Sequence, residues 1–394
     1  MNQHVQHAAR DIASAGRLPH ATLGYAPAAG TSETQRESAC GLSGPLLSNT
    51  LRQEWDELAA HCRAAPYLHP GWVEAWWRAF GAGDLDIRTL RRGKRLVGLL
   101  PMAQNHGVLE SAANYHTPAF GILAEDSEAA LALTRELFAG RPTHLSITSL
   151  DPAAETISAC QHTAEEAGYK VVIRAYQRSL YIDLNGTWGE YESGLGRNLL
   201  RNLRRARKHL EQESVLGVEI ADGRERFEGL LHEAFAVESS GWKGAGRTAI
   251  ESHPRTRDFY TDVARWGAAR GMLRLYFLRL GHRPLAMYFA LVHQGICHLL
   301  KGGYDPAYRR YSPGNLLMHA VIRDCFAAGF TRIEFNGDAE PYKFCWAAAV
   351  RERKRLEAFA PNAAGRLAWA GFTYVRPVAR RLQRALGIRT DADV

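Results

Sequence analysis

The chain has 394 residues, of which 46% are hydrophobic and 23% are charged, and its formal net charge is +8. This length accommodates two domains of ordinary size, and the composition excludes a fibrous or wholly disordered protein. No apolar run reaches the roughly 18 residues of a transmembrane helix, and the first residues lack the apolar core of a secretory signal, so we expect a cytoplasmic protein.

Residues 1–45 are rich in Ala, Gly, Ser, Thr and Pro and show no periodicity, which predicts a flexible leader. A first helix is expected just after Ser48, because this side chain can cap the helix and apolar residues follow at helical spacing. In the next expected helix, Trp72, Trp76 and Phe80 are four residues apart and share one face. We expect this aromatic stripe to be buried core rather than a ligand-stacking surface.

The remaining pattern predicts alternating strands and helices. In the first half we expect strands over 86–90, 95–102, 143–149, 169–174 and 179–184, and a helix over 153–167. In the second half we expect helices over 225–237, 257–270 and 315–328, and strands over 272–280, 285–292, 296–302 and 332–336.

A short piece of sequence recurs about 190 residues apart, at 92–100 and 280–288. Each copy is a tight turn containing glycine that leads into a strand. The repeat predicts an α/β protein with two tandem domains of one type, each a mixed central sheet flanked by helices. The expected organisation is a leader at 1–45, an N-terminal domain at 46–185, a C-terminal domain at 186–360 and a basic amphipathic tail at 361–394.

The six cysteines are scattered, without a CxxC pair or the spacing of a zinc site, which predicts reduced thiols and no metal. No Gly-x-Ser-x-Gly motif is present either, so a covalent acyl-enzyme has no support in the sequence.

Residues 297–315 combine the end of a strand, a loop with two glycines and two arginines, and the start of an apolar helix. The N–H groups and the dipole at a helix N-terminus favour anions, and arginines add charge-assisted contacts. An ordinary turn into a helix is the alternative. The candidate residues for binding a pyrophosphate and its attached arm are Gly302, Gly303, Tyr304, Arg309, Arg310, Ser312, Gly314 and Asn315.

Ionisable side chains follow the expected strand at 332–336. Asp338, Glu340, Tyr342 and Lys343 lie just beyond its end, where open α/β sheets place ligand sites. A charged turn in water is the alternative, but aromatic residues alternate with these charges and favour a site.

The ordered set of motifs resembles the CelD/BcsL-like group of GNAT-superfamily N-acyltransferases. The resemblance spans about 51–346 and rests on Gly-Tyr-Asp-Pro at 303–306, Ser-Pro-Gly at 312–314, Gly-Asp-x-x-x-Tyr-Lys at 337–343, His-Pro-Gly-Trp at 69–72, Leu-Val-Gly-Leu-Leu-Pro at 96–101 and the segment 238–244. It implies a double GNAT fold related to the Fem-type peptidyltransferases, in agreement with the internal repeat. It also implies an acyl thioester donor, acyl-CoA or acyl carrier protein, and no permanently bound cofactor.

The chain departs from the superfamily at the pyrophosphate loop. GNAT proteins usually carry Arg/Gln-x-x-Gly-x-Gly/Ala there, and residues 310–315 lack the first glycine. The usual pose of coenzyme A is therefore not implied.

The resemblance implies that an acceptor amine attacks the thioester directly, within a ternary complex. The candidates for the general base are Glu238, Asp338 and Glu340, and Tyr342 is the candidate acid for the thiolate. Backbone N–H groups of 301–303 would bind the carbonyl oxygen.

The acceptor is expected to be a primary amine, with Trp242, Lys243 and Lys343 as candidate binding residues. A structural tryptophan with a nearby Glu–Lys pair is an equal alternative for the first two. Sugar amines, amino acids, peptide side chains and polyamines all remain open as acceptors.

Two rival functions remain. One is an aminoacyl-tRNA-dependent Fem-type peptidyltransferase, which the six basic residues between 197 and 208 would serve, although the chain lacks the long helical insertion of some tRNA-using relatives. The other is a non-catalytic acyl-CoA-binding factor in polysaccharide synthesis. The aromatic and arginine-rich tail could contact a membrane surface or a carrier protein, but we favour a helix packed on the domain.

Overall fold

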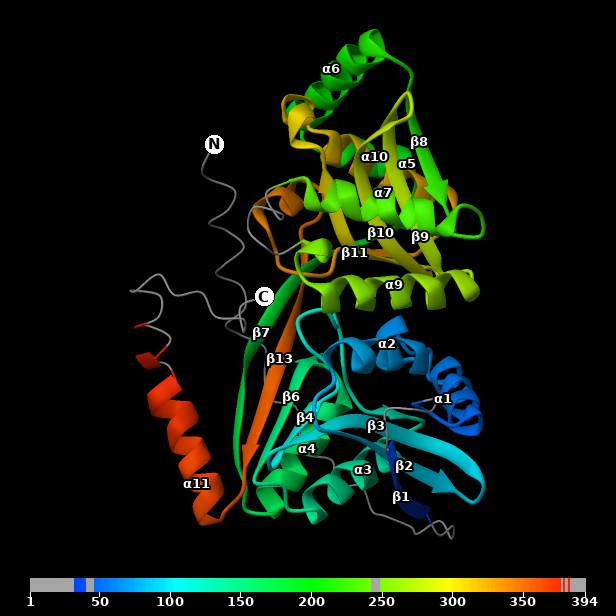
Figure 1. Ribbon diagram of the computed structural model, residues 1–394. Coiled ribbons are helices and arrows are strands. Elements are labelled where there is room, and N and C mark those ends of the chain that lie inside the picture. Colours follow the sequence, from blue (N-terminus) through cyan, green and yellow to red (C-terminus); the bar gives the residue numbers. More distant parts are fainter. Residues whose placement is uncertain (1–31, 40–45, 242–248, 377, 380–381, 383–394) are drawn as a thin grey trace. The chain divides into compact units, whose positions relative to one another are not determined.

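The computed structural model describes residues 32–39, 46–241, 249–376, 378–379 and 382 (Figure 1). Within these residues the strands form one mixed sheet of 13 strands, in the order β1-β2-β3-β4-β6-β13-β7-β12-β11-β10-β9-β8, with β5 paired to β3. The strands are β1 (Ser32–Ala39), β2 (Asp84–Arg92), β3 (Arg95–Asn105), β4 (Val108–Ser111), β5 (Leu123–Ala124), β6 (His144–Leu150), β7 (Lys170–Asp183), β8 (Leu216–Ala221), β9 (Leu273–Leu280), β10 (Arg283–His293), β11 (Ile296–Tyr304), β12 (Arg332–Glu334) and β13 (Ala349–Phe359).

Helices pack on this sheet. The α-helices are α1 (Asn49–His61), α2 (Pro70–Phe80), α3 (Ser127–Ala139), α4 (Glu155–Glu166), α5 (Trp188–Gly194), α6 (Arg197–Glu213), α7 (Phe227–Ser239), α9 (Pro254–Ala269), α10 (Pro313–Ala327) and α11 (Ala363–Ala370). Short 3-10 helices are η1 (Pro66–Leu68), η2 (Ile250–Ser252), η3 (Pro306–Tyr311) and η4 (Pro341–Cys345), and a π-helical turn, η5 (Gly371–Val375), follows α11.

The internal repeat predicted from the sequence is present in the fold. In the first half, β2, β3 and β4 are successively antiparallel, and β6 joins β4 in parallel. In the second half, β9, β10 and β11 are successively antiparallel, and β12 joins β11 in parallel. The two recurring segments are the hairpins β2–β3 and β9–β10. The expected fold class, tandem α/β domains with mixed sheets, is therefore confirmed.

Each half completes its sheet with a strand from the other part of the chain. β7 lies at the end of the first half but pairs with β12, and β13 lies at the end of the second half but pairs with β6. β7 and β13 also pair with each other along the whole of β13, side by side in Figure 1. The expected domain boundary between residues 185 and 186 thus separates the two halves along the chain, but the two halves share one continuous sheet.

Several elements differ from the sequence-based expectation. The strands expected at 169–174 and 179–184 form one strand, β7, because its polar middle is paired with β13. β13 itself was not predicted, because charged residues occupy buried positions and break the apolar alternation: Glu357 is 0% exposed. Its carboxylate is held by His144 at 2.6 Å and by Arg355.

The segment expected to be an unstructured leader contains a strand. β1 lies within 1–45 and pairs antiparallel with β2 at the end of the sheet. Backbone pairing to an existing strand does not need the hydrophobic pattern by which strands are recognised in a sequence. The remainder of the leader lies outside the described residues.

The aromatic stripe of α2 is core, as expected. Trp72 is fully buried and Trp76 nearly so, and Trp72 meets Phe259 of α9 edge to face at 5.2 Å between ring centroids. The same core cluster includes Phe289 of β10, so the two halves share one hydrophobic core.

The described part of the tail packs against the sheet. Lys170 of β7 lies 3.7 Å from the ring centroid of Trp369, and Phe372 meets Phe359 at 5.3 Å. Leu367 is 76% exposed on another side of α11, so contact with a membrane or carrier protein stays a prediction. Among the described residues, no helix has the length and apolar character needed to cross a bilayer.

Candidate active site

The central strands of the second half diverge and open the sheet. β11 and β12 pair in parallel over only three residue pairs, from Ile296↔Arg332 to His298↔Glu334. β11 then continues to Tyr304, while the chain after Glu334 leaves the sheet. Opposite β10 the register shifts so that Leu300 has no partner, which is a β-bulge at the point of divergence. A ligand can therefore meet the backbone of β11 between the two strands.

The turn after β12 explains why that strand is short. Asn336 and Gly337 both have positive φ, 47° and 58°, a conformation that glycine and asparagine adopt at low cost. The turn directs Asp338 and Glu340 away from the sheet. Lys343 fixes this segment, because its Nζ donates to the carbonyls of Asn336 at 3.1 Å and Asp338 at 2.7 Å and lies 3.0 Å from Glu340.

A first cavity, the α10 cavity, lies at the N-terminus of α10 and has a volume of about 330 Å³. Most of the residues expected to bind the pyrophosphate and its arm line it. Its lining consists of Glu238, Gly241, Tyr288, Gly302, Gly303, Tyr304, Arg309, Ser312, Gly314, Asn315 and Tyr342.

The start of α10 suits an anion. Ser312, the N-cap residue, has a left-handed backbone with φ 49°, and no side chain caps the helix. Arg309 lines the cavity, whereas Arg310 is directed toward Glu213 of α6, with 3.9 Å between NH2 and Oε1. The structure thus brings one of the two predicted arginines to the cavity.

The two glycines that end β11 have a packing role. A Cβ on Gly302 would lie 2.3 Å from the ring of Tyr288, and one on Gly303 would lie 2.5 Å from Cα of Glu238. Glycine is therefore required for α7 and Tyr288 to approach β11, and the same approach shapes the α10 cavity. Glu238 is buried there, and its Oε2 accepts the backbone N–H of Ile250 at 2.8 Å.

A second cavity, the β11 cavity, occupies the opening between β11 and the segment after β12 and has a volume of about 220 Å³. Both halves of the chain contribute to it. Its lining consists of Tyr115, His116, Pro118, Tyr260, Tyr288, Leu299, Leu300, Lys301, Gly302, Met318, Phe335, Asn336, Gly337, Asp338, Glu340, Tyr342 and Lys343.

Tyr288, Gly302 and Tyr342 line both cavities, so the cavities adjoin. Burial raises the pKa of the Tyr342 hydroxyl well above its usual range, and so do Tyr288 and a hydrogen bond to Glu340. Burial also raises the pKa of Tyr288, whose hydroxyl lies 3.5 Å from the carbonyl of Gly314. Both phenols are therefore protonated at neutral pH and can donate a hydrogen bond or a proton.

The first half contributes an imidazole and a phenol. Nδ1 of His116 lies 3.2 Å from the hydroxyl of Tyr260. Burial, together with the charge of Lys301, lowers the pKa of His116 to about 3, so the ring is neutral. Burial and the charges of Asp338 and Glu340 raise the pKa of Tyr115 to about 12.

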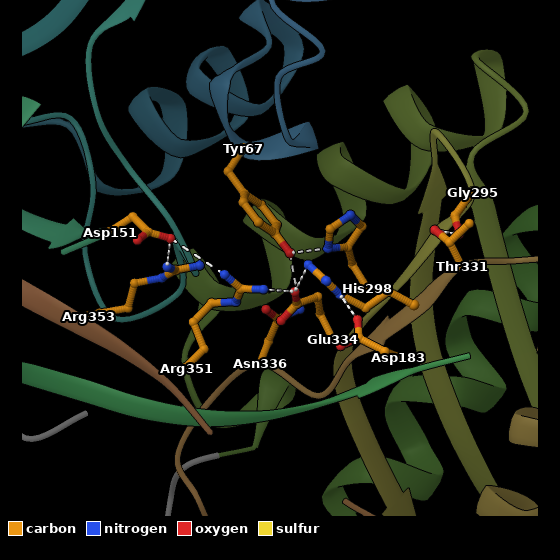
Figure 2. Close-up of polar contacts among 11 residues, drawn as sticks. Tyr67, Asp151, Asp183, Gly295, His298, Thr331, Glu334, Asn336, Arg351 and Arg353 are labelled. Carbon is orange, nitrogen blue, oxygen red and sulfur yellow. Dashed lines mark hydrogen bonds and ion pairs between the residues drawn. The ribbon is translucent and has the colours of Figure 1, made fainter. Parts of the chain in front are cut away.

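A buried polar network lies beside the β11 cavity (Figure 2). The amide nitrogen of Asn336 donates to the hydroxyl of Tyr67 at 3.0 Å, and that hydroxyl lies 2.9 Å from Nδ1 of His298. Since the phenol oxygen accepts from Asn336, its own proton goes to His298. Burial lowers the pKa of His298 to about 3, which agrees with a neutral ring that accepts at Nδ1.

Charged groups continue the network toward the first half (Figure 2). Arg351 of β13 donates to Glu334 at 2.9 Å and lies 3.6 Å from Asp151, and Arg353 donates to the same aspartate at 2.7 Å. Burial raises the pKa of Glu334, although Arg351 opposes this effect. The network therefore connects β12, which ends at the cavity, with strand β13 and the loop after β6.

The predicted site residues thus fall into three groups. Gly303, Tyr304, Arg309, Ser312, Gly314, Asn315 and Glu238 line the α10 cavity, Asp338, Glu340 and Lys343 line the β11 cavity, and Gly302 and Tyr342 line both. Arg310 is directed toward α6. Trp242 and Lys243 lie outside the described residues.

Sequence reasoning did not identify Tyr288, Tyr115, His116 or the side chain of Lys301 as site residues. Tyr288 lies in a strand whose pattern predicts core, and the other half of the chain gives no local signal that Tyr115 and His116 reach this cavity. Among the described residues, no group of three or more His, Cys, Asp or Glu side chains could hold a metal ion.

Residues 197–344 match the family model described as an acetyltransferase (GNAT) domain. No curated protein matches the chain. The matched residues include the whole lining of the α10 cavity and all of the β11 cavity lining except Tyr115, His116 and Pro118.

Solved structures match the chain at low sequence identity. One is the C-terminal domain (DUF2156) of a protein from Agrobacterium fabrum described as a lysylphosphatidylglycerol synthetase, at 13% identity and TM-score 0.52, over 82% of this chain and 95% of that one. Another is FemX, at 12% identity and TM-score 0.53, over 77% and 95%. A tandem GNAT protein from the clavulanic acid biosynthesis pathway matches at 12% identity and TM-score 0.46, over 84% and 100%.

Proposed function

We propose that the protein is an N-acyltransferase that moves an acyl group from a thioester, on coenzyme A or on an acyl carrier protein, directly onto a primary amine. The observation that carries the proposal is the pair of adjoining cavities on either side of Gly302. One reaches a helix N-terminus that suits a phosphate, and the other presents carboxylates that suit an amine. A ternary complex needs two such sites meeting at the reacting carbon.

The α10 cavity receives the donor. The phosphate end lies at Ser312 and Gly314 near Arg309, and the pantetheine arm follows β11 toward the bulge. Because the first glycine of the usual pyrophosphate loop is missing and Ser312 has a left-handed backbone, the phosphate contacts differ from the usual pattern. Either donor class supplies the same phosphopantetheine arm.

The β11 cavity receives the acceptor, and a carboxylate there removes the ammonium proton. Glu340 is less available for this step than Asp338, because its carboxylate already pairs with the ammonium of Lys343 at 3.0 Å. Glu238 lies in the other cavity and binds the backbone of Ile250. Asp338, which is exposed, is therefore our candidate base.

The transfer step then balances. The amine nitrogen, having given a proton to Asp338, attacks the thioester carbonyl, and the C–N bond forms. A backbone N–H near the bulge at Leu300 binds the developing oxyanion. The C–S bond breaks, and Tyr342, which lines both cavities, gives its proton to the leaving thiolate. The nitrogen loses its second proton, which restores the Tyr342 phenol through solvent, and Asp338 returns the first proton to solvent. The products are an amide and a free thiol.

The test is release of free thiol when purified protein is mixed with acyl-CoA, or with acyl carrier protein, of increasing chain length and a panel of amines. We expect release that depends on both the thioester and the amine. Binding of a donor without thiol release from any amine would instead support the non-catalytic acyl-CoA-binding factor. The proposal fails if neither donor binds by calorimetry.

The outer face of α6 favours a second candidate, an aminoacyl-tRNA-dependent peptidyltransferase. Five basic residues are exposed on the side opposite the buried Leu203, Ala206 and Leu210. The five residues are Arg197, Arg201, Arg204, Arg205 and Lys208. This face suits RNA phosphates. A gel shift with aminoacyl-tRNA that weakens steeply with salt, together with no thiol release from acyl-CoA, would favour this candidate.

A further inference from the structure

The β11 cavity has charged groups of opposite sign on its two walls. Lys301 lies on β11, and Asp338 and Glu340 lie on the segment after β12. These two stretches of chain pair only as far as His298↔Glu334 and then diverge, so the cation and the carboxylates line opposite sides of the opening. Such a cavity differs from one built for a simple amine, which needs carboxylates alone.

The negative wall has one carboxylate that an acceptor can neutralise. Glu340 is already compensated by Lys343 at 3.0 Å, whereas the salt bridges between described residues do not include Asp338. An ammonium group of the acceptor beside Asp338 would balance that charge. This step coincides with the role of Asp338 as the proposed base.

The positive wall is built around Lys301 and His116. The ammonium of Lys301 lies 5.2 Å from the ring centroid of Tyr260, and its charge contributes to the lowered pKa of His116. The cation is therefore located where the first half of the chain closes the cavity. A polyamine or a simple alkylamine would bring no group of opposite charge to this wall.

His116 adds a neutral hydrogen-bond donor beside this cation. The buried hydroxyl of Tyr260 lies 3.2 Å from Nδ1 of His116, its one hydrogen-bond partner among the described residues. Leaving a buried phenol proton unpaired is costly, so Tyr260 donates and Nδ1 accepts. The proton of the neutral imidazole is then on Nε2. His116 lines the β11 cavity, so Nε2 can donate to a ligand there.

We propose that the β11 cavity selects an acceptor that carries a carboxylate close to its amine, as an α-amino acid does. The ammonium group lies at Asp338, and the carboxylate lies at Lys301 with a hydrogen bond from Nε2 of His116. The proposal rests on the proposed N-acyl transfer and names its acceptor class. A cavity of about 220 Å³ has room for an amino acid with a side chain of moderate size.

The test compares acceptors that differ only in the carboxylate: phenylalanine against phenethylamine, and leucine against 3-methylbutylamine. We expect kcat/KM for thiol release to be at least tenfold higher for each amino acid. Lys301→Met should reduce that preference at least tenfold through KM, and Lys301→Arg should retain most of it. Lys94→Met, in the exposed turn between β2 and β3, is the matched control and should leave the preference unchanged.

The outcomes separate this proposal from the proposed function. Thiol release with equal or better turnover of the decarboxylated amines keeps N-acyl transfer and overturns the acceptor class. An amino-acid preference that Lys301→Met does not reduce also overturns it. If no amine releases thiol, the proposed function fails. Calorimetric titration of the same acceptor pairs then still tests whether the β11 cavity prefers amino acids. The proposed site is supported if the amino acids bind more tightly than the matching amines and Lys301→Met abolishes the difference. It is overturned if the amino acid and the amine of each pair bind equally.

Discussion

The hydroxyl of Tyr67 lies 2.9 Å from Nδ1 of His298, although 231 positions separate the two residues in the sequence. Tyr67 belongs to η1 in the first half, and His298 is the last residue of β11 that pairs with β12. The contact therefore joins the first half of the chain to the point where the central strands diverge. Tyr67 also accepts from Asn336, which lines the β11 cavity, so this buried contact between the halves lies directly beside that cavity.

Tyr67→Phe should destabilise the protein. It removes the acceptor for the amide of Asn336 and the donor for Nδ1 of His298, and both groups are buried. Leaving buried polar groups unpaired costs about 1–3 kcal/mol, measurable by urea denaturation. Tyr374→Phe is the control, because its side chain is 61% exposed. Equal unfolding midpoints for the two variants would contradict the importance of this contact.

Stability should fall in mild acid because of two buried imidazoles. Burial lowers the pKa values of His116 and His298 to about 3, whereas the unfolded chain takes up protons near the ordinary value of 6.5. The folded pKa is depressed, so the stabilisation is present above pH 6.5 and is lost as the pH falls below it. We expect a loss of about 2 kcal/mol for each imidazole between pH 7 and pH 5, seen by denaturation at both pH values.

His116→Gln should remove about half of this dependence on pH while leaving the dependence due to His298. An unfolding midpoint of the unaltered protein that is the same at pH 7 and pH 5 would show that these rings are protonated in the folded state.

Arg351→Met should be more destabilising than Glu334→Gln. The first variant leaves Glu334, whose side chain is 10% exposed, without its 2.9 Å partner, and breaking such a buried pair costs about 3–5 kcal/mol. The second leaves a neutral amide that can still accept from Arg351. The double variant, Arg351→Met with Glu334→Gln, should be more stable than Arg351→Met alone, because no uncompensated buried charge then remains on β12. Denaturation midpoints of the three variants test this order, and an equal loss in both single variants would contradict it.

Local patterns predict much of the fold, and the internal repeat predicts its duplication. The hairpins β2–β3 and β9–β10 were predicted from one turn with glycine and a following apolar strand. β13 could not be predicted in this way, because Arg353 and Glu357 occupy buried positions that ion pairs satisfy. Such pairs depend on partners more than 200 positions away, at Asp151 and His144.

The candidate site was predictable where it is local. The loop from Gly302 to Asn315 and the cluster after β12 each carry a motif of contiguous residues. The wall from the first half was not predictable, because His116 reaches the β11 cavity only through the packing of α2 on α9 and the loop after β4. Sequence periodicity reports which face of an element is buried, but it does not report which distant loop covers it.

Tyr342→Phe should lower kcat for thiol release by about 10- to 100-fold, because the leaving thiolate loses its proton donor. Tyr288→Phe is the comparison, since Tyr288 lines both cavities and its hydroxyl lies near the carbonyl of Gly314. A thioester of a more acidic thiol needs less protonation and should restore much of the Tyr342→Phe rate. Equal defects with both thioesters would show that Tyr342 positions the substrate rather than protonating the thiolate.

Asp338→Asn should lower kcat by about 100-fold or more, whereas Glu340→Gln should have a smaller effect. The difference follows from the geometry, since Lys343 compensates Glu340 at 3.0 Å and also holds the backbone of the same segment. Raising the pH should partly rescue Asp338→Asn, because more of the acceptor amine is then already deprotonated. If Glu340→Gln instead has the larger defect and is the variant that high pH rescues, the two carboxylates exchange roles. If neither change lowers kcat, Glu238 or solvent takes the proton.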